Sequence, residues 1–215
     1  MNRFLAILLV FSIGCAAEQA AEAEKDWMIG AAATAEEVHP LLPGMTAASF
    51  EAQLADGSAF TFDSSQLGAP AILVFYRGGW CPYCNRQLMG LRTIDDDLVD
   101  MGYELYFISA DRPEKLAAAP DTLDVSYTLL SDNELDVSKA YGIAYRLDEA
   151  TIERYSNGGP DLEDASGYDH FLLPAPSVFI VDTTGVIQFQ YTNPNYRVRL
   201  EHSVLLAAAH AALPE

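Results

Sequence analysis

The sequence predicts an α/β fold in which helices flank a central mixed β-sheet. Apolar runs rich in β-forming residues, at 70–76 and 103–109, are each followed by the start of a helical pattern. Near the end of the chain, 176–182 and 186–191 are separated by the turn sequence "TTG", which is typical of a β-hairpin. Alternating strands and helices favour parallel pairing, and the closing hairpin adds antiparallel strands, so we expect a mixed sheet.

The remaining elements follow in order along the chain. Two short segments within 48–62, around Asp56-Gly57, have a hairpin signature and extend the predicted fold at its N-terminal side. Apolar residues recur at helical spacing through residue 100 and predict one helix: Leu88, Leu91, Ile94 and Leu98. Further elements are expected from 113 (a helix), at 127–130 (a strand), 134–141 (a helix) and 199–213 (a terminal helix). The polar stretch 148–170 is longer than a plain connection needs.

Three segments make up the predicted domain organisation. Residues 1–14 are expected to be a secretory signal, because Arg3 precedes an apolar run too short to span a bilayer as a permanent helix. Residues 15–40, rich in Ala and Glu, are interpreted as a spacer. Residues 41–215 form the domain, which is long enough for one well-filled core.

Cys15 is the candidate site of lipid attachment. The preceding "SIG" is similar to a bacterial lipoprotein box, in which small residues precede a cysteine that receives acyl chains. The sequence therefore predicts export to the periplasmic side of a bacterial envelope and anchoring through Cys15, since more than one acyl chain gives stable attachment. The alternative is cleavage near Ala16-Ala17, which would release a soluble protein.

The charge balance limits the classes of partner. Lys and Arg number 12 against 31 Asp and Glu, which gives a formal net charge of −19 at pH 7. A surface of this sign repels phosphate backbones and anionic lipid, so nucleic-acid binding is not expected. Membrane contact is expected through the lipid anchor only.

The two other cysteines lie in "FYRGGWCPYC" (75–84), between a predicted strand and a predicted helix. Exposed backbone N–H groups and the helix dipole favour a thiolate at Cys81. Cys84, one helical turn later, can resolve a mixed disulfide or a sulfenic acid. Arg77 either adds positive charge near the sulfurs or is a solvated loop residue. This pattern indicates a redox pair; sulfurs buried in hydrocarbon, or sulfurs that point away from each other with no helix starting there, would count against it.

Structural roles explain the pair less well. A bracing disulfide stabilises most by closing a long loop, and Cys81–Cys84 closes almost none. A zinc site needs about four ligands, and the sequence has no second C-x-x-C and no closely spaced His pair. We therefore expect neither a metal nor a cofactor.

The chain resembles the AhpC/TSA peroxiredoxin-like proteins of the thioredoxin-fold superfamily from about residue 41 to 210. Six blocks carry the resemblance: "LLPGMTAASF", "FYRGGWCPYCNRQL", "ISADRPEKL", "YTLLSD", "AYGIAYR" and "PAPSVFIVDTTGVI". It implies a thioredoxin-like fold, antioxidant thiol-redox activity and recharging by a thioredoxin-like reductant. It also implies supporting roles for Trp80, as a wall of the site, and for Pro176, where such folds carry a cis-proline. From the sequence, the Ala175–Pro176 bond is equally compatible with a trans strand entry.

One motif departs from the family pattern. Typical peroxiredoxins carry P-x-x-x-T-x-x-C, in which the cysteine attacks peroxide and the threonine orients it. Aligning that cysteine with Cys84 places Cys81 at the threonine and Arg77 at the proline. The usual arginine before the late strand is also missing from its place, and Arg197 and Arg199 lie further on as alternative cations.

Three functions remain open. As a peroxidase, a thiolate (Cys84 by alignment, or Cys81) reduces hydrogen peroxide or an organic hydroperoxide, and the pair then closes into a disulfide. As an extracytoplasmic thiol-disulfide oxidoreductase, Cys81 attacks disulfides of other proteins and Cys84 resolves. As a non-enzymatic lipoprotein, the fold binds a metal or a partner, with His170 as a candidate loop ligand. The family blocks favour the first and the missing threonine favours the second.

Overall fold

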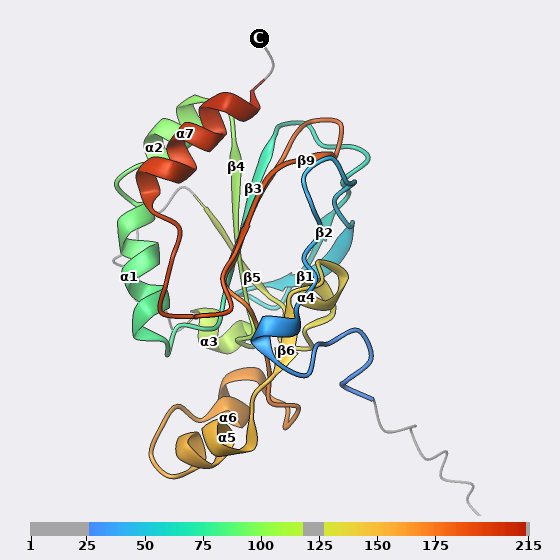
Figure 1. The fold of residues 1–215 in the computed structure, drawn as a ribbon. Coiled ribbons are helices and arrows are strands. Elements are labelled where there is room, and N and C mark those ends of the chain that lie inside the picture. Colours follow the sequence, from blue (N-terminus) through green and yellow to red (C-terminus); the bar gives the residue numbers. More distant parts are fainter. Residues whose placement is uncertain (1–25, 118–126, 214–215) are drawn as a thin grey trace, which may run out of the picture.

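A seven-stranded mixed sheet forms the centre of the computed structural model, which describes residues 26–117 and 127–213 (Figure 1). Its strand order is β2-β1-β5-β4-β3-β8-β9. The bounds are β1 Phe50–Leu54, β2 Ala59–Phe62, β3 Ala71–Tyr76, β4 Glu104–Ser109, β5 Thr128–Ser131, β8 Ser177–Val181 and β9 Ile187–Thr192. A separate two-stranded sheet pairs β6 (Ala144–Arg146) with β7 (Leu172–Pro174).

The pairing confirms the predicted mixed sheet. Strands β3, β4 and β5 are parallel to one another, as expected for strands linked through helices. Strand β8 runs antiparallel to both β3 and β9, so the predicted closing hairpin is present. The N-terminal hairpin is present too, but β1 also pairs antiparallel with β5. The hairpin therefore extends the main sheet rather than standing apart from it.

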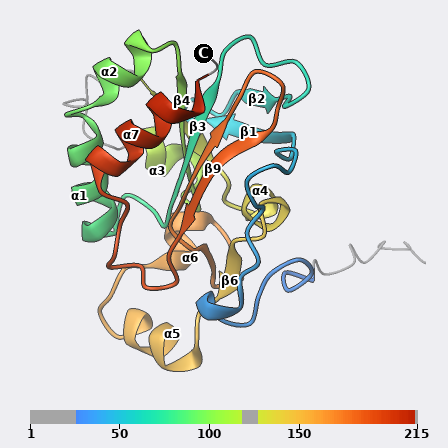
Figure 2. The same cartoon turned by 45° about the horizontal axis from the view of Figure 1, so that its top comes forward.

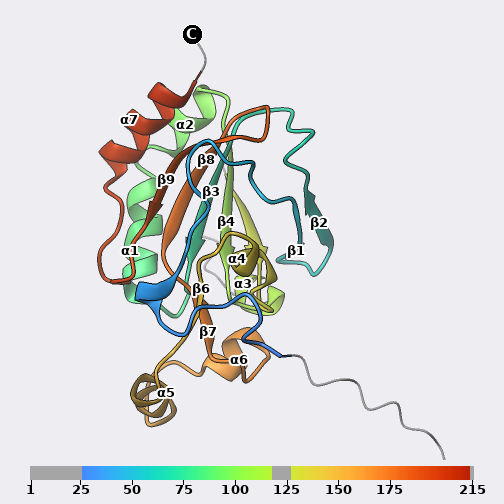
Figure 3. The same cartoon turned by 45° about the vertical axis from the view of Figure 1, so that its right-hand side comes forward.

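Side chains that alternate along β3 fill two separate cores. Leu73 and Phe75 pack into one cluster, whereas Ile72, Val74 and Tyr76 pack into the other. The second cluster lies under α1 (Pro82–Leu91), α2 (Asp95–Asp100) and α7 (His202–Ala212), which cover one face together in all three views (Figures 1, 2 and 3). The first cluster lies under the N-terminal segment, α4 (Asp136–Ala140) and β6.

The single helix expected through residue 100 is wrong, because the chain turns between α1 and α2. The N–H groups of Thr93 and Ile94 bond to carbonyls three residues back, and the Thr93 hydroxyl donates to Gly90 O at 2.7 Å. Two β-branched residues and a competing side-chain hydroxyl are a poor helix interior. The apolar spacing survives the turn, since Leu91 and Leu98 still face the same core.

The polar stretch 148–170 contains two helices that the sequence did not predict. These are α5 (Glu149–Ser156) and α6 (Leu162–Ser166), and they lie beyond one end of the sheet, at the bottom of Figure 1. Asp148 caps α5 by accepting from Thr151 N, and Asp161 caps α6 by accepting from Asp164 N. The helix expected from residue 113 begins there as α3 (Pro113–Ala117), and its continuation lies outside the described residues.

The described part of the predicted spacer, 26–40, packs on the domain. It contains a 3₁₀ turn (Ala35–Glu37), and Ala32 forms a parallel bridge with Tyr145. His39 N donates to Gly142 O at 2.9 Å. Gly142 has φ +69, and a Cβ there would lie 2.1 Å from the His39 carbonyl oxygen, so this approach requires glycine.

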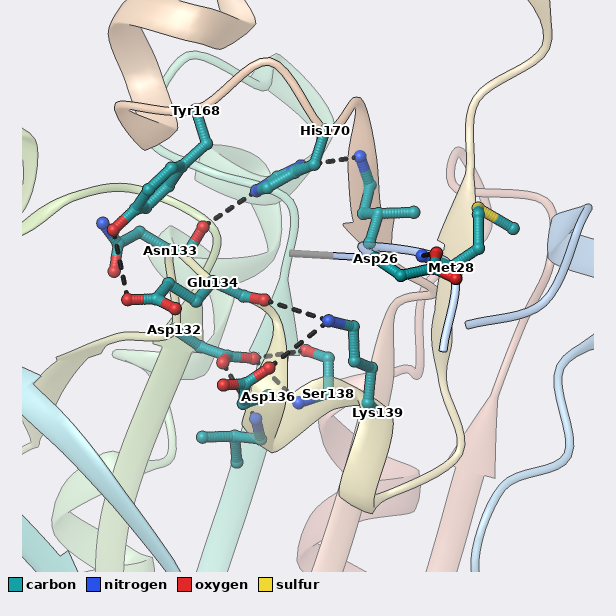
Figure 4. A network of polar contacts seen from close by, with 12 residues as sticks. Asp26, Met28, Asp132, Asn133, Glu134, Asp136, Ser138, Lys139, Tyr168 and His170 are labelled. Carbon is teal, nitrogen blue, oxygen red and sulfur yellow. Dashed lines mark hydrogen bonds and ion pairs between the residues drawn. The ribbon is translucent and has the colours of Figure 1, made fainter. Parts of the chain in front are cut away.

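A buried polar network holds α4 and the loop before β7 together (Figure 4). The Asp132 carboxylate accepts from Val137 N, Ser138 N and the Ser138 hydroxyl, at 2.9, 2.8 and 2.6 Å. The His170 ring accepts from Leu172 N through Nδ1 and contacts Asn133 O through Nε2, both at 2.9 Å. These contacts fix the segment that leads back into the main sheet.

Over the described ranges, no helix is both long and apolar enough to cross a membrane.

Candidate functional site

The two cysteines of 75–84 lie where β3 ends and α1 begins. Cys81 is the N-cap residue of α1, Pro82 occupies the first helical position, and Cys84 lies in the first turn. Proline suits that position because its missing N–H would have no partner there. A tight turn precedes Cys81: Gly78 has φ +151, and Cys81 N donates to Gly78 O at 3.1 Å. The helix start that the redox interpretation requires is present.

Both sulfurs are buried free thiols. Cys81 is 1% exposed and Cys84 is 0% exposed, and both belong to the core cluster under α1. Burial in an apolar environment by itself disfavours a thiolate. The surroundings of these sulfurs are not hydrocarbon alone, however, because two guanidinium groups reach them.

Arg199 supplies the first guanidinium. It lies in the loop between β9 and α7, and its Nη2 is 3.2 Å from Cys84 Sγ and 4.0 Å from Cys81 Sγ. Its Nε and Nη1 are buried and have no hydrogen-bond partner among the described residues. Arg197, the other expected cation, is exposed and lies over the Tyr196 ring at 5.5 Å. The structure therefore brings Arg199, and not Arg197, to the cysteine pair.

Arg77 supplies the second guanidinium. Its side chain is 1% exposed, so the alternative of a solvated loop residue is wrong. The guanidinium carbon lies 4.1 Å from the Tyr196 ring and 5.1 Å from the Trp80 ring, and Nη2 donates to Tyr155 Oη at 3.1 Å. The aromatic rings around Arg77 hold its guanidinium near Cys81. The positive charge of Arg77 lowers the pKa of Cys81.

The two thiols have opposite pKa shifts. A hydrogen bond from the Cys84 thiol, aided by Arg77 and Arg199 and opposed by burial, lowers the pKa of Cys81 to about 5. Burial raises the pKa of Cys84 well above its ordinary value, with a further contribution from the bond to Cys81. The favoured state is therefore a Cys81 thiolate that accepts a hydrogen bond from a neutral Cys84 thiol.

Tyr155 is a site residue that the sequence did not single out. It comes from α5, and its ring also packs edge-on against Trp80, with centroids 6.1 Å apart. Trp80 is thus half-buried between Arg77 and the helices of 148–170, in the place expected for a wall of the site. The unusual length of 148–170 was the signal for this addition.

Pro176 and His170 have other roles than those considered for them. The Ala175–Pro176 bond is trans, so the cis-proline implied by the resemblance is not present. Pro176 is buried between β7 and β8, and its carbonyl accepts from Asn193 N at 3.1 Å. His170 is 3% exposed, and both ring nitrogens take part in the network of Figure 4.

Two further candidate sites concern metal binding and lipid attachment. Within 26–117 and 127–213, no three His, Cys, Asp or Glu side chains gather in a way that could hold a metal ion. Cys15, the candidate for lipid attachment, lies outside the described residues.

Comparison with known proteins places this arrangement in a family. The model of the AhpC/TSA family matches residues 43–190, which include both cysteines and the whole of the parallel sheet. The chain belongs to the AhpC/TSA family. Arg199 lies beyond the matched segment of this AhpC/TSA protein, which is consistent with a cation supplied from a different place than the usual one.

Individual relatives agree with this assignment. Peroxiredoxin Bcp of Escherichia coli K12 is 32% identical over 106 residues, which are 49% of this chain and 67% of the relative. Among solved structures, peroxidoxin BcpB from Mycobacterium tuberculosis superposes with a TM-score of 0.59 at 21% identity, over 79% of this chain and 96% of that one. A peroxiredoxin-like protein from Aquifex aeolicus gives 0.61 at 15% identity, over 81% and 90%. The structural likeness shows that this AhpC/TSA protein has the thioredoxin-type fold of peroxiredoxins.

Proposed function

We propose that this protein is a thiol-dependent peroxidase that reduces hydroperoxides with Cys81 and Cys84. One observation carries the proposal: two free thiols lie together at a helix start, with Arg199 Nη2 3.2 Å from Cys84 Sγ and 4.0 Å from Cys81 Sγ, and the pKa of Cys81 is lowered while that of Cys84 is raised. Family membership supports peroxide as the oxidant. The lowered pKa of Cys81 favours it as the attacking sulfur, whereas the motif alignment gives that role to Cys84, which Arg199 contacts more closely.

The proposed peroxidase reaction follows from the charges of Cys81 and Arg199. The Cys81 thiolate attacks one peroxide oxygen, the O–O bond breaks, and the leaving oxygen departs as water or an alcohol after taking up a proton. The unpartnered Nε and Nη1 of Arg199 are suitable donors to that oxygen as negative charge develops on it. Cys81 is left as a sulfenic acid.

Cys84 then completes the cycle. Its sulfur attacks the sulfenic sulfur, water leaves, and a Cys81–Cys84 disulfide forms. A thioredoxin-like dithiol protein restores both thiols by exchange and is itself oxidised to a disulfide. Both sulfurs are buried in the dithiol form, so the peroxide needs a local movement around the start of α1 to reach them.

Stopped-flow mixing of the reduced protein with hydrogen peroxide and with an organic hydroperoxide tests this proposal. We expect Cys84→Ser to consume one equivalent of peroxide and stop at the sulfenic acid, and Cys81→Ser to react no faster than a free thiol. The opposite result would make Cys84 the attacking sulfur. Oxidation of the wild-type protein no faster than a free thiol would exclude a peroxidase.

A second function, reduction or exchange of protein disulfides, is favoured by one observation. Cys81 occupies the family's threonine position and is the more acidic thiol, an arrangement suited to attack on a disulfide. An insulin-reduction assay distinguishes the two functions. Turnover of insulin at a rate that exceeds peroxide consumption would make disulfide exchange the main activity.

We also propose that the protein is exported to the bacterial cell envelope and anchored through lipid on Cys15. The support is the sequence alone: a short apolar run after Arg3, followed by "SIGC". The formal charge of −19 gives no affinity for nucleic acid or anionic lipid, so the acyl chains would be the membrane contact. Labelled palmitate should enter the wild-type protein and not Cys15→Ser; equal labelling of both would contradict the proposal.

A further inference from the structure

A buried carboxylate lies under the turn that precedes Cys81. Asp111 follows the end of β4 and is 3% exposed. Its Oδ2 accepts a hydrogen bond from Gly79 N at 2.6 Å and a longer one from the Ser109 hydroxyl at 3.4 Å. Its hydrogen bond to Gly79 N joins Asp111 to the turn that leads into Cys81.

The turn 78–80 lies in close contact with the Asp111 carboxylate. A Cβ on Gly78 would lie 2.6 Å from Asp111 Oδ1 and 2.3 Å from Trp80 Nε1, so only glycine fits there. The Trp80 side chain, beside this carboxylate, is a further hydrogen-bond donor to it. A buried carboxylate is costly to keep, which indicates that its position serves a purpose.

The Gly79 peptide is held from both sides. Asp111 accepts a hydrogen bond from Gly79 N, and Asn85 of α1 donates from Nδ2 to the Gly79 carbonyl oxygen at 2.9 Å. The same turn continues directly into Cys81, whose N–H bonds back to Gly78 O. A shift of the Gly79 peptide therefore moves the Cys81 sulfur relative to Cys84 and Arg199.

We propose that Asp111 is a positioning residue of the thiol site, which fixes the turn 78–80 so that the Cys81 sulfur receives its stabilising contacts. The inference rests on the proposed function only in taking Cys81 as the reacting thiol. Burial raises the pKa of Asp111 to about 6, and the titratable groups that act on it from neighbouring elements are Lys115 of α3 and Tyr76 of β3.

The direction in which the Cys81 pKa shifts distinguishes a positioning role of Asp111 from a purely electrostatic effect of its charge. Removing a negative charge near a thiolate would lower the pKa of Cys81, whereas releasing the turn would raise it. We expect Asp111→Ala to raise the pKa of Cys81 by about one unit, which at pH 5 lowers the thiolate fraction and the rate of alkylation by iodoacetamide about fivefold. Both readouts use the reduced protein without peroxide, so a failed peroxidase assay leaves them unaffected.

Matched variants complete the test. Asp111→Asn keeps an acceptor for Gly79 N and should restore the Cys81 pKa, while the exposed Glu114→Gln removes one charge nearby and should leave it unchanged. Asn85→Ala frees the turn from its other side at an exposed position and should also raise the Cys81 pKa. The proposal is overturned by an unchanged or lowered Cys81 pKa in Asp111→Ala, by failure of Asp111→Asn to restore it, or, if Asp111→Ala does not fold, by no rise in Asn85→Ala.

Discussion

Arg199 Nη2 lies 3.2 Å from the sulfur of Cys84, although the two residues are 115 positions apart in the chain. The same nitrogen is 4.0 Å from Cys81 Sγ, so one guanidinium serves both sulfurs. Each step of a dithiol cycle needs one sulfur to be ionised, and burial opposes this at both positions. A cation placed between the two can stabilise whichever thiolate the cycle requires.

Replacing Arg199 should therefore impair both halves of the reaction. Arg199 lowers the pKa of Cys81 and opposes the rise at Cys84, so Arg199→Gln should raise both thiol pKa values. At neutral pH a rise of about one unit leaves Cys81 almost fully ionised, whereas at Cys84, whose pKa is already raised, it lowers the thiolate fraction and the rate of disulfide formation about tenfold. Stopped-flow tryptophan fluorescence after mixing with peroxide measures this rate.

Arg197→Gln is the matched control, because it removes the same charge two residues earlier from an exposed position. Its rate should stay within about twofold of wild type, since exposed charges are screened by solvent and salt. Equal loss in both variants would mean that the general positive potential of the loop matters and that the contact with Cys84 does not.

The pH dependence of thiol reactivity follows from the lowered pKa of Cys81. The thiolate is the reactive form, so the alkylation rate of Cys81 should be constant above its pKa and fall as the pH drops through about 5. The hydrogen bond from Cys84 is the largest cause of this shift, and Cys84→Ala should move the midpoint upward. Cys84→Ser retains a hydroxyl donor and should keep more of the shift. A wild-type midpoint near the ordinary cysteine value would contradict this assignment of charge.

Local pattern was enough to predict the elements that build the site. The apolar run before Arg77 and the C-x-x-C after it predict a buried strand and a helix start, and both lie where expected. Such features depend on neighbours in sequence: β-branched runs form buried strands, and proline suits the first helical turn.

Contacts between distant segments could not be predicted in the same way. The sequence offered Arg199 only as one of two alternative cations and did not single out Tyr155, because their partners lie 115 and 78 positions away. The dipeptide Ala175–Pro176 likewise does not decide between a cis and a trans bond, which the structure shows to be trans. The role of a residue that acts through a contact with a distant segment can be assigned only once the fold is known.

The hydroxyl of Tyr155 on α5 stabilises the site by accepting a hydrogen bond from Arg77. Tyr155→Phe removes the acceptor for Arg77 Nη2 but keeps the ring against Trp80. Because the Arg77 guanidinium is buried, the loss should lower the free energy of unfolding by about 1–3 kcal/mol. Urea denaturation gives this value. Ser156→Ala, which removes an exposed hydrogen bond to Ile152 O on the same helix, should change it by less than about 0.5 kcal/mol.

Trp27 should decide whether the N-terminal segment stays docked. Its ring lies 5.0 Å from that of Tyr168 and 4.9 Å from that of His170, and Lys139 Nζ lies 5.5 Å from its centroid. Trp27→Ala removes this half-buried aromatic cluster, which should lower the free energy of unfolding by about 1–3 kcal/mol. Limited proteolysis should then cut within 26–34 faster than in wild type, while Met28→Ala, at an exposed neighbouring position, should be cut at the wild-type rate. Unchanged cleavage in Trp27→Ala would show that the bridge between Ala32 and Tyr145 is sufficient to hold the segment.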